Sequence, residues 1–368
     1  MRIGIDARLL HYREGGIAVY IRQVVKALAA IDRESDFRVL HSRRDRHALT
    51  PGPNFRPARL WTPCHHRLEK WALAAEILPL RLNVLHSPDF IPPLGGAKRH
   101  VITVHDLNFL YYPQFLTAES RRYYNGQIRR AVRQADHILA VSEATRNDLV
   151  ARLDVPPDKV TVHVEGVEPA FRPLSEEAVD AALQELALPR GYILFVGTFE
   201  PRKNIPGLLN AYQCLRAGLP DAPPLVLVGR RGWLVDDLER RVMELGLSSH
   251  VHWRENPPQA LMPALYNAAS LLAMPSFYEG FGLPALEAMA CGLPTVVANR
   301  AALPEVVGDA GLLVDPDDPE DIAAGMRRLL GDSTLQAQLR AAGLERAKRF
   351  TWHQAAVVIH AVYQRLAT

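Results

Sequence analysis

The sequence predicts an α/β protein of two domains, each built on a parallel β-sheet that helices cover on both faces. Three observations lead to this fold class. The chain of 368 residues is longer than a single hydrophobic core of ordinary size accommodates. Short apolar runs alternate with longer helical patterns, as they do in proteins with parallel sheets. This alternation pauses once, in a proline-rich stretch, and then starts again.

In the first half of the chain, the apolar runs have the length and composition of buried strands. We expect strands at Arg2–Asp6, Phe37–His41, Val84–His86, His100–His105, His137–Val141 and Val160–Val164. Helical patterns separate them, as at Ala18–Ile31 and Ala118–Gln134.

The pause covers residues 168–190, where three prolines surround a polar helical pattern at Glu176–Leu186. The strands expected after it are Tyr192–Val196, Leu225–Val228, Val251–Trp253, Leu271–Met274, Thr295–Ala298 and Leu312–Val314. We therefore expect two Rossmann-like domains, 1–170 and 171–351, that face each other across an interdomain cleft. Ligands of such sheets bind at the carboxyl ends of the strands.

Composition indicates a soluble globular protein, with 48% hydrophobic and 23% charged residues. No apolar run approaches the roughly 18 residues of a membrane span, and the N-terminus lacks the pattern of a signal peptide. Three scattered cysteines predict neither a disulfide framework nor a zinc site, so we expect a cytoplasmic protein. The net charge of +3 is small.

The segment from 271 to 292 is the most informative. An apolar strand leads into a loop with Gly280 and Gly282, and Pro284 suits the first turn of a helix that Gly292 would end. The backbone N–H groups around Gly282 and Leu283 would then lie at the positive end of the helix dipole. This arrangement predicts a phosphate site.

Two glutamates flank this predicted anion site. Glu279 lies in the loop before the helix, and Glu287 lies one turn into it. Carboxylates do not bind phosphate, but they accept hydrogen bonds from hydroxyl groups, such as the vicinal diols of a sugar and a ribose. Singly, each glutamate would be an ordinary surface or first-turn residue. Their spacing and the glycines between them favour a binding role.

The Glu279-x7-Glu287 pattern resembles the E-x7-E motif of retaining GT-B glycosyltransferases of the group 1, sugar-nucleotide family. Further segments are similar to motifs of this family, in the same order along the chain: Gly15-Gly16, Thr103-Val104-His105-Asp106, Ala140-Val141-Ser142-Glu143, Phe195 through Asn204, and Val228-Gly229-Arg230. The resemblance thus covers most of the chain. It implies that a C-terminal helix, 352–368, packs back on the first domain.

The resemblance also implies roles for the matching residues. The first domain would bind the acceptor and the second the nucleotide-sugar donor, with His105 near the transferred sugar. The donor would be held by Gly15, Gly16, Gly229, Arg230, Gly280, Phe281, Gly282, Leu283 and Glu287. We expect Glu279, His105, Arg202 and Lys203 to be the catalytic residues.

Arg202 and Lys203 make sense from chemistry as well. They follow a buried strand at its carboxyl end, where a ligand would lie. A nucleoside diphosphate gains negative charge as it leaves, and a guanidinium and an ammonium stabilise that charge. In the family they take the place of a divalent metal, so no metal and no other cofactor is expected.

Several other patterns were weighed. Asp315-Pro316-Asp317 reads as D-x-D, but the following Asp318-Pro319 is a helix cap, which explains these aspartates without a metal. The first strand lacks the G-x-G-x-x-G turn of nicotinamide enzymes. The His65-His66 pair has no second pair of ligands nearby and is expected at the surface. His86 ends a strand and is either structural or part of an acceptor pocket.

The resulting prediction is a retaining hexosyltransferase, with mannose from GDP-mannose favoured and a polysaccharide, glycolipid or small molecule as acceptor. The alternatives are a UDP-sugar-dependent transferase, a UDP-sugar 2-epimerase, and a donor-binding subunit without turnover. The loop 254–258 lies near the expected base pocket and departs from the family, whose members commonly carry a glycine there. The sequence therefore does not determine which nucleotide base the donor carries. No nucleic acid partner is expected.

The basic N-terminal half has two interpretations. Residues 1–65 hold twelve Lys and Arg against six Asp and Glu, and the stretch from Arg121 to Arg133 adds five arginines. They form a solvated surface or a peripheral contact with the inner face of an anionic membrane. A helix starting at Arg67 would place Leu68, Trp71, Ala75 and Leu78 on one face.

Overall fold

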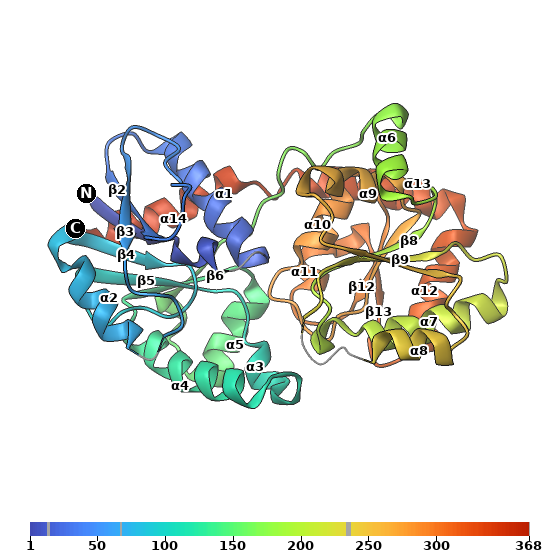
Figure 1. Ribbon diagram of the computed structural model, residues 1–368, viewed down its shortest axis with the longest axis horizontal. Helices are drawn as coiled ribbons and strands as arrows, with labels where there is room; N and C mark the ends of the chain where they lie inside the picture. Colours follow the sequence, from blue (N-terminus) through green and yellow to red (C-terminus); the bar gives the residue numbers. More distant parts are fainter. Residues whose placement is uncertain (13–14, 67, 233–236, 368) are drawn as a thin grey trace. The chain divides into compact units, whose positions relative to one another are not determined.

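The computed structural model describes residues 1–12, 15–66, 68–232 and 237–367, except for the side chains at 119, 120, 122 and 123. The chain forms two compact units (Figure 1). Unit 1 comprises Met1–Gly166 and Thr351–Thr368, and unit 2 comprises Val167–Phe350. The chain therefore first passes from unit 1 to unit 2 after Gly166, four residues before the predicted boundary at residue 170.

Within the described residues of unit 1, seven parallel strands form one sheet in the order β3-β2-β1-β4-β5-β6-β7. The strands are β1 Arg2–Asp6, β2 Asp36–Ser42, β3 Phe55–Leu60, β4 Leu82–Ser87, β5 Ala97–Val104, β6 His137–Ala140 and β7 Val160–Val162. The helices are α1 Gly16–Ile31, α2 Glu69–Ile77, α3 Asn108–Tyr111, α4 Ala118–Gln134, α5 Glu143–Leu153 and α14 Trp352–Ala367. Helix α14 packs against α1 and β4.

Strand β3 was not predicted. Its sequence FRPARL alternates without a continuous apolar run, and only Phe55 and Leu60 are buried. Pro57, which cannot donate a backbone hydrogen bond, is tolerated because β3 pairs on one side only, with β2.

In the described part of unit 2, six parallel strands have the order β10-β9-β8-β11-β12-β13. The strands are β8 Ile193–Val196, β9 Leu225–Gly229, β10 Val251–Glu255, β11 Leu271–Met274, β12 Thr295–Ala298 and β13 Leu312–Val314. The helices are α6 Glu176–Leu186, α7 Ile205–Gly218, α8 Leu238–Glu244, α9 Met262–Ala268, α10 Leu283–Ala290, α11 Leu303–Val307, α12 Pro319–Gly331 and α13 Ser333–Ala347.

The central strands of both sheets are buried along nearly their whole length, as β6, β8, β11 and β12 are at every position. Such strands need cover on both faces, which the helices supply. Among the described helices, none combines the length and the apolar character required to cross a bilayer.

Candidate functional site

In each sheet there is one point at which the chain stops adding strands on one side and continues on the other. The loops that follow the two strands at this point run in opposite directions. In unit 2 the chain runs from β8 outward to β9 and β10, then returns to β11 on the other side of β8. The loops that leave β8 and β11 therefore separate at their carboxyl ends, which is where ligands bind in open α/β sheets. Arg202 and Lys203 follow β8 in a 3-10 turn, and Glu279 follows β11.

These three side chains are in direct contact, although 76 residues of chain separate Lys203 from Glu279. Arg202 Nη1 lies 2.7 Å from Glu279 Oε2, and Lys203 Nζ lies 2.6 Å from Glu279 Oε1. A second carboxylate joins them, because Arg202 Nε lies 2.6 Å from Glu200 Oε1. The sequence motifs predicted the first three of these residues as site residues but did not single out Glu200.

Burial makes this cluster electrostatically strong. The side chains of Lys203 and Glu279 are 8% and 7% exposed. Burial alone would raise the pKa of Glu279, but the charges of Lys203 and Arg202 outweigh it and lower the pKa to about 2. Burial, followed by repulsion from Arg202, lowers the pKa of Lys203. Glu279 is therefore a permanent carboxylate at neutral pH.

Asn204 holds the turn that carries the two cations. Its backbone is left-handed, with φ of 56°, and its Oδ1 accepts a hydrogen bond from Gly207 N as the cap of α7. Its Nδ2 donates to the carbonyl oxygens of Pro275 and Pro316, in the loops after β11 and β13. One buried side chain thus connects three loops at the carboxyl edge of the sheet.

The loop after Glu279 leads into α10 as the sequence predicted. Gly282 precedes the helix with φ of 108°, a conformation that other residues rarely adopt, and a Cβ there would lie 2.7 Å from Leu303. No side chain caps this helix end, so the backbone N–H groups of Gly282 and Leu283 remain at the positive end of the dipole. Phe281, in contrast, is buried against Phe350.

Glu287 lies in the second turn of α10 and is partly exposed. Tyr266, fully buried in α9, donates a hydrogen bond of 2.6 Å to Glu287 Oε2. Burial, then the charge of Glu287, raises the pKa of Tyr266 well above its usual value, so the phenol stays a donor. This contact fixes the orientation of the carboxylate, and nothing in the sequence singled out Tyr266.

Gly229 is the last residue of β9, the neighbour of β8, and Arg230 follows it. A Cβ on Gly229 would lie 1.8 Å from the carbonyl oxygen of Gly197, so only glycine allows the two loops to approach. Arg230 is exposed at this edge. The adjacent Arg231 pairs with Glu239 and with Glu255. Glu255 is the last residue of β10, whereas the sequence predicted a loop over 254–258.

The remaining predicted residues lie in unit 1. Gly15, with φ of 134°, precedes α1, and Gly16 is its first residue. Both glycines are exposed, and a Cβ on Gly16 would contact nothing within 4 Å. Among the described residues, no side chain caps α1, and its first turn holds no acidic residue, so this helix end can accept an anion.

His105 follows β5, and each of its ring nitrogens lies near an oxygen that can accept a hydrogen bond. Nε2 lies 2.9 Å from the carbonyl oxygen of Pro88, and Nδ1 lies 3.4 Å from Glu165 Oε1. Burial alone would lower the pKa of His105, but the hydrogen bond and charge of Glu165 raise it overall. The arrangement favours the doubly protonated ring, and Glu165 was missed from the sequence.

The structure also places two other histidines. His86 is fully buried between Thr103 and Tyr363, and burial lowers its pKa to about 3, so it is neutral and packed in the interior of unit 1. His65 was expected at the surface. It is instead partly buried, with Nε2 at 2.8 Å from Asp89 Oδ2.

The aspartates of the D-x-D pattern behave as cap and turn residues. Asp318 caps α12, and Asp315 and Asp317 both pair with Arg300. Ser142, the strand-end serine, caps α5. No three His, Cys, Asp or Glu side chains in the described ranges are grouped so that they could hold a metal ion.

Comparison with family models matches both halves of the chain. Residues 182–346 match the family described as glycosyl transferases group 1, and residues 14–171 match glycosyltransferase family 4. The first match contains Arg202, Lys203, Glu279 and Glu287.

Curated relatives are similar over most of the chain. The O-antigen chain mannosyltransferase B of Escherichia coli is 36% identical over 290 residues, which is 78% of this chain and 74% of the relative. The serotype-specific mannosyltransferase WbdA of Escherichia coli is 32% identical over 71% of this chain, which spans 33% of that longer protein. A D-inositol 3-phosphate glycosyltransferase from Salinispora tropica is 37% identical over 61% of this chain and 49% of its own length.

Solved structures share the fold at lower identity. Sucrose-phosphate synthase from Thermosynechococcus elongatus superposes with a TM-score of 0.79 at 22% identity, over 99% of this chain and 98% of that chain. Anabaena HepE in complex with UDP-glucose superposes with a TM-score of 0.77 at 16% identity, over 99% and 100%. The fold is thus the GT-B fold of two Rossmann-like domains.

Proposed function

The chain belongs to the group 1 glycosyl transferases, and from this premise we propose that it transfers a hexose, mannose from GDP-mannose, to a hydroxyl group of a polysaccharide, glycolipid or small-molecule acceptor. The names of its mannosyltransferase relatives support the choice of mannose. The resemblance of its motifs to retaining enzymes supports retention of the anomeric configuration.

One observation carries this proposal: Arg202, Lys203 and Glu279 meet at the carboxyl edge of β8 and β11, beside the uncapped end of α10. The two cations bind the diphosphate, and the N-terminus of α10 adds backbone donors. Glu279 is their partner when no diphosphate is bound. A bound diphosphate competes for the same cations and frees the carboxylate for the sugar.

The chemistry follows from these charges. The bond between sugar C1 and the phosphate oxygen breaks, and its electron pair leaves with the diphosphate, where Arg202 and Lys203 stabilise the growing negative charge. C1 becomes electron-poor, and the fixed negative charge of Glu279 stabilises it. The acceptor oxygen bonds to C1 and gives up its proton to the departing diphosphate, which has gained the electron pair of the broken bond. Because the cations already neutralise the diphosphate, we propose that no divalent metal is required.

Donor and mechanism are tested together. A thermal-shift panel of GDP, UDP and ADP and of their sugars identifies the base, because only ligands of the folded state raise the midpoint. Transfer from GDP-mannose to glycoside acceptors, with the product anomer assigned by NMR, then tests retention. A midpoint that rises with UDP-sugars alone would favour the UDP-sugar-dependent alternative. HepE in complex with UDP-glucose is a structural precedent for that donor. An epimer formed from donor alone would overturn transfer.

The surface of unit 1 supports a second part of the proposal, peripheral contact with an anionic membrane. Trp71 and Ala75 in α2, and Leu68 and Leu78 at its two ends, are exposed. The exposed fractions of Leu68, Trp71 and Leu78 are 58%, 52% and 65%. Arg67, the predicted start of this helix, lies outside the described residues.

Beside α2, Trp61 is 71% exposed, and its backbone N–H is held by Glu76 of that helix. Cations accompany both indoles, with the Arg43 guanidinium 3.4 Å from the Trp61 ring centroid and Lys70 Nζ 4.0 Å from that of Trp71. Indoles beside cations suit the interface of an anionic bilayer.

Sedimentation with liposomes of rising anionic lipid content checks this contact. The protein should bind in proportion to anionic lipid at low salt, and Trp71→Glu should reduce binding. Met243→Glu in α8, an equally exposed apolar position of unit 2, is the matched control and should bind like the wild type. Absence of binding at low salt would refute the contact.

A further inference from the structure

A polar pocket lies in unit 2 at the edge of the sheet opposite to the donor site. Ser270 precedes β11 and Pro294 precedes β12, and both residues line the pocket. Because the strands are parallel, their amino ends share one edge of the sheet, whereas Glu279 follows the carboxyl end of β11. The pocket has a volume of about 390 Å³, within the roughly 300–1,000 Å³ that is typical of sites for small molecules.

One wall of this pocket is a polar face of helix α13. Ser333, Gln336 and Arg340 are spaced three and four residues apart, so they lie on the same side of the helix, and all three line the pocket. Nδ-type crowding does not occupy these groups: Nε2 of Gln336 donates to the carbonyl oxygen of Leu329. Within the described ranges, the Ser333 hydroxyl, the Gln336 Oε1 atom and the Arg340 guanidinium have no hydrogen-bond or ion-pair partner. These groups can therefore bind a ligand.

Arg340 determines the charge of the pocket. Among the described residues that line it, Arg340 is the only one with a charged side chain. Gly292, just after α10, has φ of 73°, and a Cβ on it would lie 3.3 Å from Arg340 Nε. The guanidinium thus lies close against the end of that helix. A guanidinium without a carboxylate partner binds phosphate and carboxylate groups through paired hydrogen bonds, so the pocket favours an anion.

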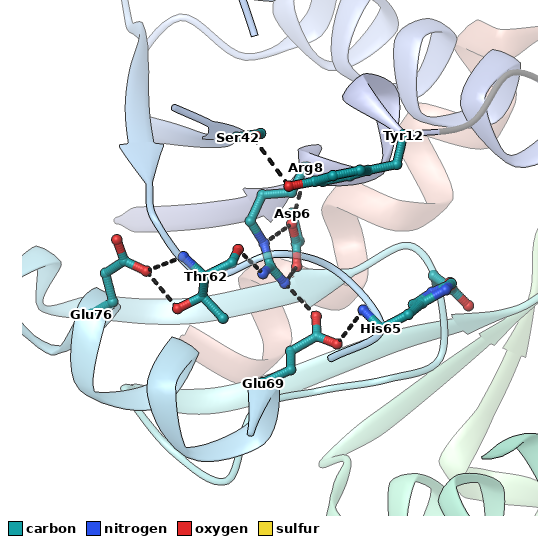
Figure 2. Close-up of polar contacts among 9 residues, drawn as sticks. Asp6, Arg8, Tyr12, Ser42, Thr62, His65, Glu69 and Glu76 are labelled. Atoms are coloured by element: carbon teal, nitrogen blue, oxygen red, sulfur yellow. Dashed lines mark hydrogen bonds and ion pairs between the residues drawn. The ribbon is translucent and has the colours of Figure 1, made fainter. Parts of the chain in front are cut away.

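The buried charges of unit 1 differ in this respect, as Figure 2 shows. Arg8 donates to both carboxylate oxygens of Asp6, to Glu69 Oε1 and to the carbonyl oxygen of Thr62, at 2.7 to 2.9 Å. Its side chain is 1% exposed. All three nitrogens of this guanidinium are therefore used within the protein, whereas Arg340 is exposed and lines a pocket.

The other wall of the pocket suits a sugar ring. Leu293 and Pro294 are apolar residues of the loop between α10 and β12, and such side chains pack on the carbon face of a ring. Ser270 Oγ donates to the carbonyl oxygen of Gly191 at 2.7 Å, and it still can accept a hydrogen bond from a sugar hydroxyl. A sugar with one acidic group would use both walls, which an inorganic anion or a neutral sugar would not.

Tyr266 connects this pocket to the donor site. It lines the pocket, and its hydroxyl donates a hydrogen bond of 2.6 Å to Glu287 Oε2. Cys291 and Gly292, which also line the pocket, follow the last turn of α10, the helix that carries Glu287 and begins at Leu283 beside the predicted phosphate site. A ligand packed on this wall therefore restricts the side chain that orients Glu287.

We propose that the pocket is an effector site for an anionic sugar, whose acidic group binds Arg340 and whose ring packs on Leu293 and Pro294. Occupancy strengthens nucleotide binding by holding Tyr266 in the position that orients Glu287. Binding in the pocket does not depend on the proposed transferase activity, whereas the coupling rests on the nucleotide site of that activity.

The first test is titration calorimetry with saturating GDP present, so that the donor site is occupied. Mannose 6-phosphate and glucuronate supply the two kinds of acidic group, and methyl mannoside and inorganic phosphate supply the ring and the charge separately. At least one anionic sugar should bind about tenfold more tightly than either of these two. Failure of both anionic sugars to bind, or equal binding of methyl mannoside, would overturn the proposal. If no nucleotide binds, the proposed function fails, and titration without nucleotide still tests the pocket.

Arg340→Gln tests whether the anionic sugar binds in this pocket. The change removes the positive charge, so affinity for the anionic sugar should fall about tenfold. Arg328→Gln is the matched control, because Arg328 is an exposed arginine of α12 that does not line the pocket, and this variant should bind like the wild type. Unchanged affinity in Arg340→Gln, or equal losses in the two variants, would place the binding elsewhere and refute the proposal.

The coupling is measured by titrating GDP with and without the saturating anionic sugar. Affinity for GDP should rise about fivefold, and GDP should strengthen binding of the anionic sugar by the same factor. In Tyr266→Phe the anionic sugar should still bind, but neither ligand should change the affinity for the other. Competition between GDP and the anionic sugar would show that both bind in the donor site, and independent binding in the wild type would refute the effector role.

Discussion

At the scale of single residues, the pairing of Glu279 with Arg202 and Lys203 determines what each side chain does before a ligand binds. The carboxylate neutralises two buried cations, and they in turn keep it ionised. Glu287 has a different partner, the neutral phenol of Tyr266. The two glutamates of one motif are therefore expected to have separate roles, Glu279 at the transferred sugar and Glu287 at the ribose.

Glu279→Gln and Glu287→Ala should consequently differ. Glu279→Gln should lower kcat and the free energy of unfolding, the latter by about 3 kcal/mol, because it removes the negative charge that pairs with the buried Lys203. Its affinity for GDP should survive, since the diphosphate no longer competes with the carboxylate. Glu287→Ala should weaken GDP binding by about 1–3 kcal/mol. Calorimetry with GDP beside donor kinetics checks both, and equal losses of GDP affinity would show that the roles are shared.

Tyr266→Phe tests whether the orientation of Glu287 matters for nucleotide binding. The change removes one hydroxyl and should weaken GDP binding several-fold, because the carboxylate loses its fixed position. Tyr192→Phe is the control, since Tyr192 also donates a buried hydrogen bond, to the carbonyl oxygen of Leu265 next to Tyr266. Titration calorimetry should show an effect in the first variant only. If both variants bind GDP like the wild type, Tyr266 is a packing residue.

At the scale of elements, unit 1 is connected through a chain of buried polar contacts. Tyr363 of α14 contacts His86 of β4, which contacts Thr103 of β5. Thr103 contacts Tyr20 of α1, which contacts His163 beyond β7. Each contact is 2.5 to 3.0 Å long. The C-terminal helix is therefore attached to the sheet by hydrogen bonds as well as by apolar packing.

This network predicts a loss of stability in mild acid. Burial lowers the pKa of both His86 and His163 to about 3, so both are neutral when folded and bind protons only in the unfolded chain between pH 6.5 and 3. The free energy of unfolding should fall as pH is lowered from 7 to 5. His105 acts in the opposite direction, because its raised pKa adds stability below pH 6.5 that is lost as pH rises.

Urea unfolding at pH 7 and pH 5 measures the effect, in a range where most carboxylates stay ionised. The free energy of unfolding of His163→Asn should fall less between pH 7 and pH 5 than that of the wild type, because only His86 of this pair remains. His353 is an exposed histidine at the start of α14. The free energy of unfolding of His353→Asn should therefore fall by the same amount as that of the wild type. A wild type that is equally stable at both pH values would contradict the prediction.

At the scale of the whole molecule, the chain crosses between the units twice. The crossings lie at Gly166 and Thr351, and the last helix returns to unit 1. Gly166 lies against the second crossing so closely that a Cβ on it would be 2.2 Å from Trp352 N. The last helix therefore completes the unit in which the chain begins.

Metal independence is proposed for the complete enzyme, and chelation tests it. Because Arg202 and Lys203 supply positive charge to the diphosphate, transfer in excess EDTA should proceed at the rate found without chelator. Adding Mg²⁺ or Mn²⁺ should change kcat by less than about twofold. Activity that is abolished by EDTA and restored by Mn²⁺ would refute the proposal and would require a metal held jointly with the diphosphate.

The sequence by itself determined the α/β class, most strands, the helix Glu176–Leu186, and the cations and glutamates of the second unit. These features are local, because apolar periodicity, capping residues and strand-end motifs act within a few residues of chain.

Only the tertiary structure decided which side chains meet. It brought Lys203 to Glu279 across 76 residues and His65 to Asp89 across 24, and it buried His86 where the sequence left its role open. It also showed that an edge strand with Pro57 still pairs. Contacts of this kind depend on which strands are neighbours in a sheet, and sheet order is set by the packing of the whole unit, because no short segment encodes it.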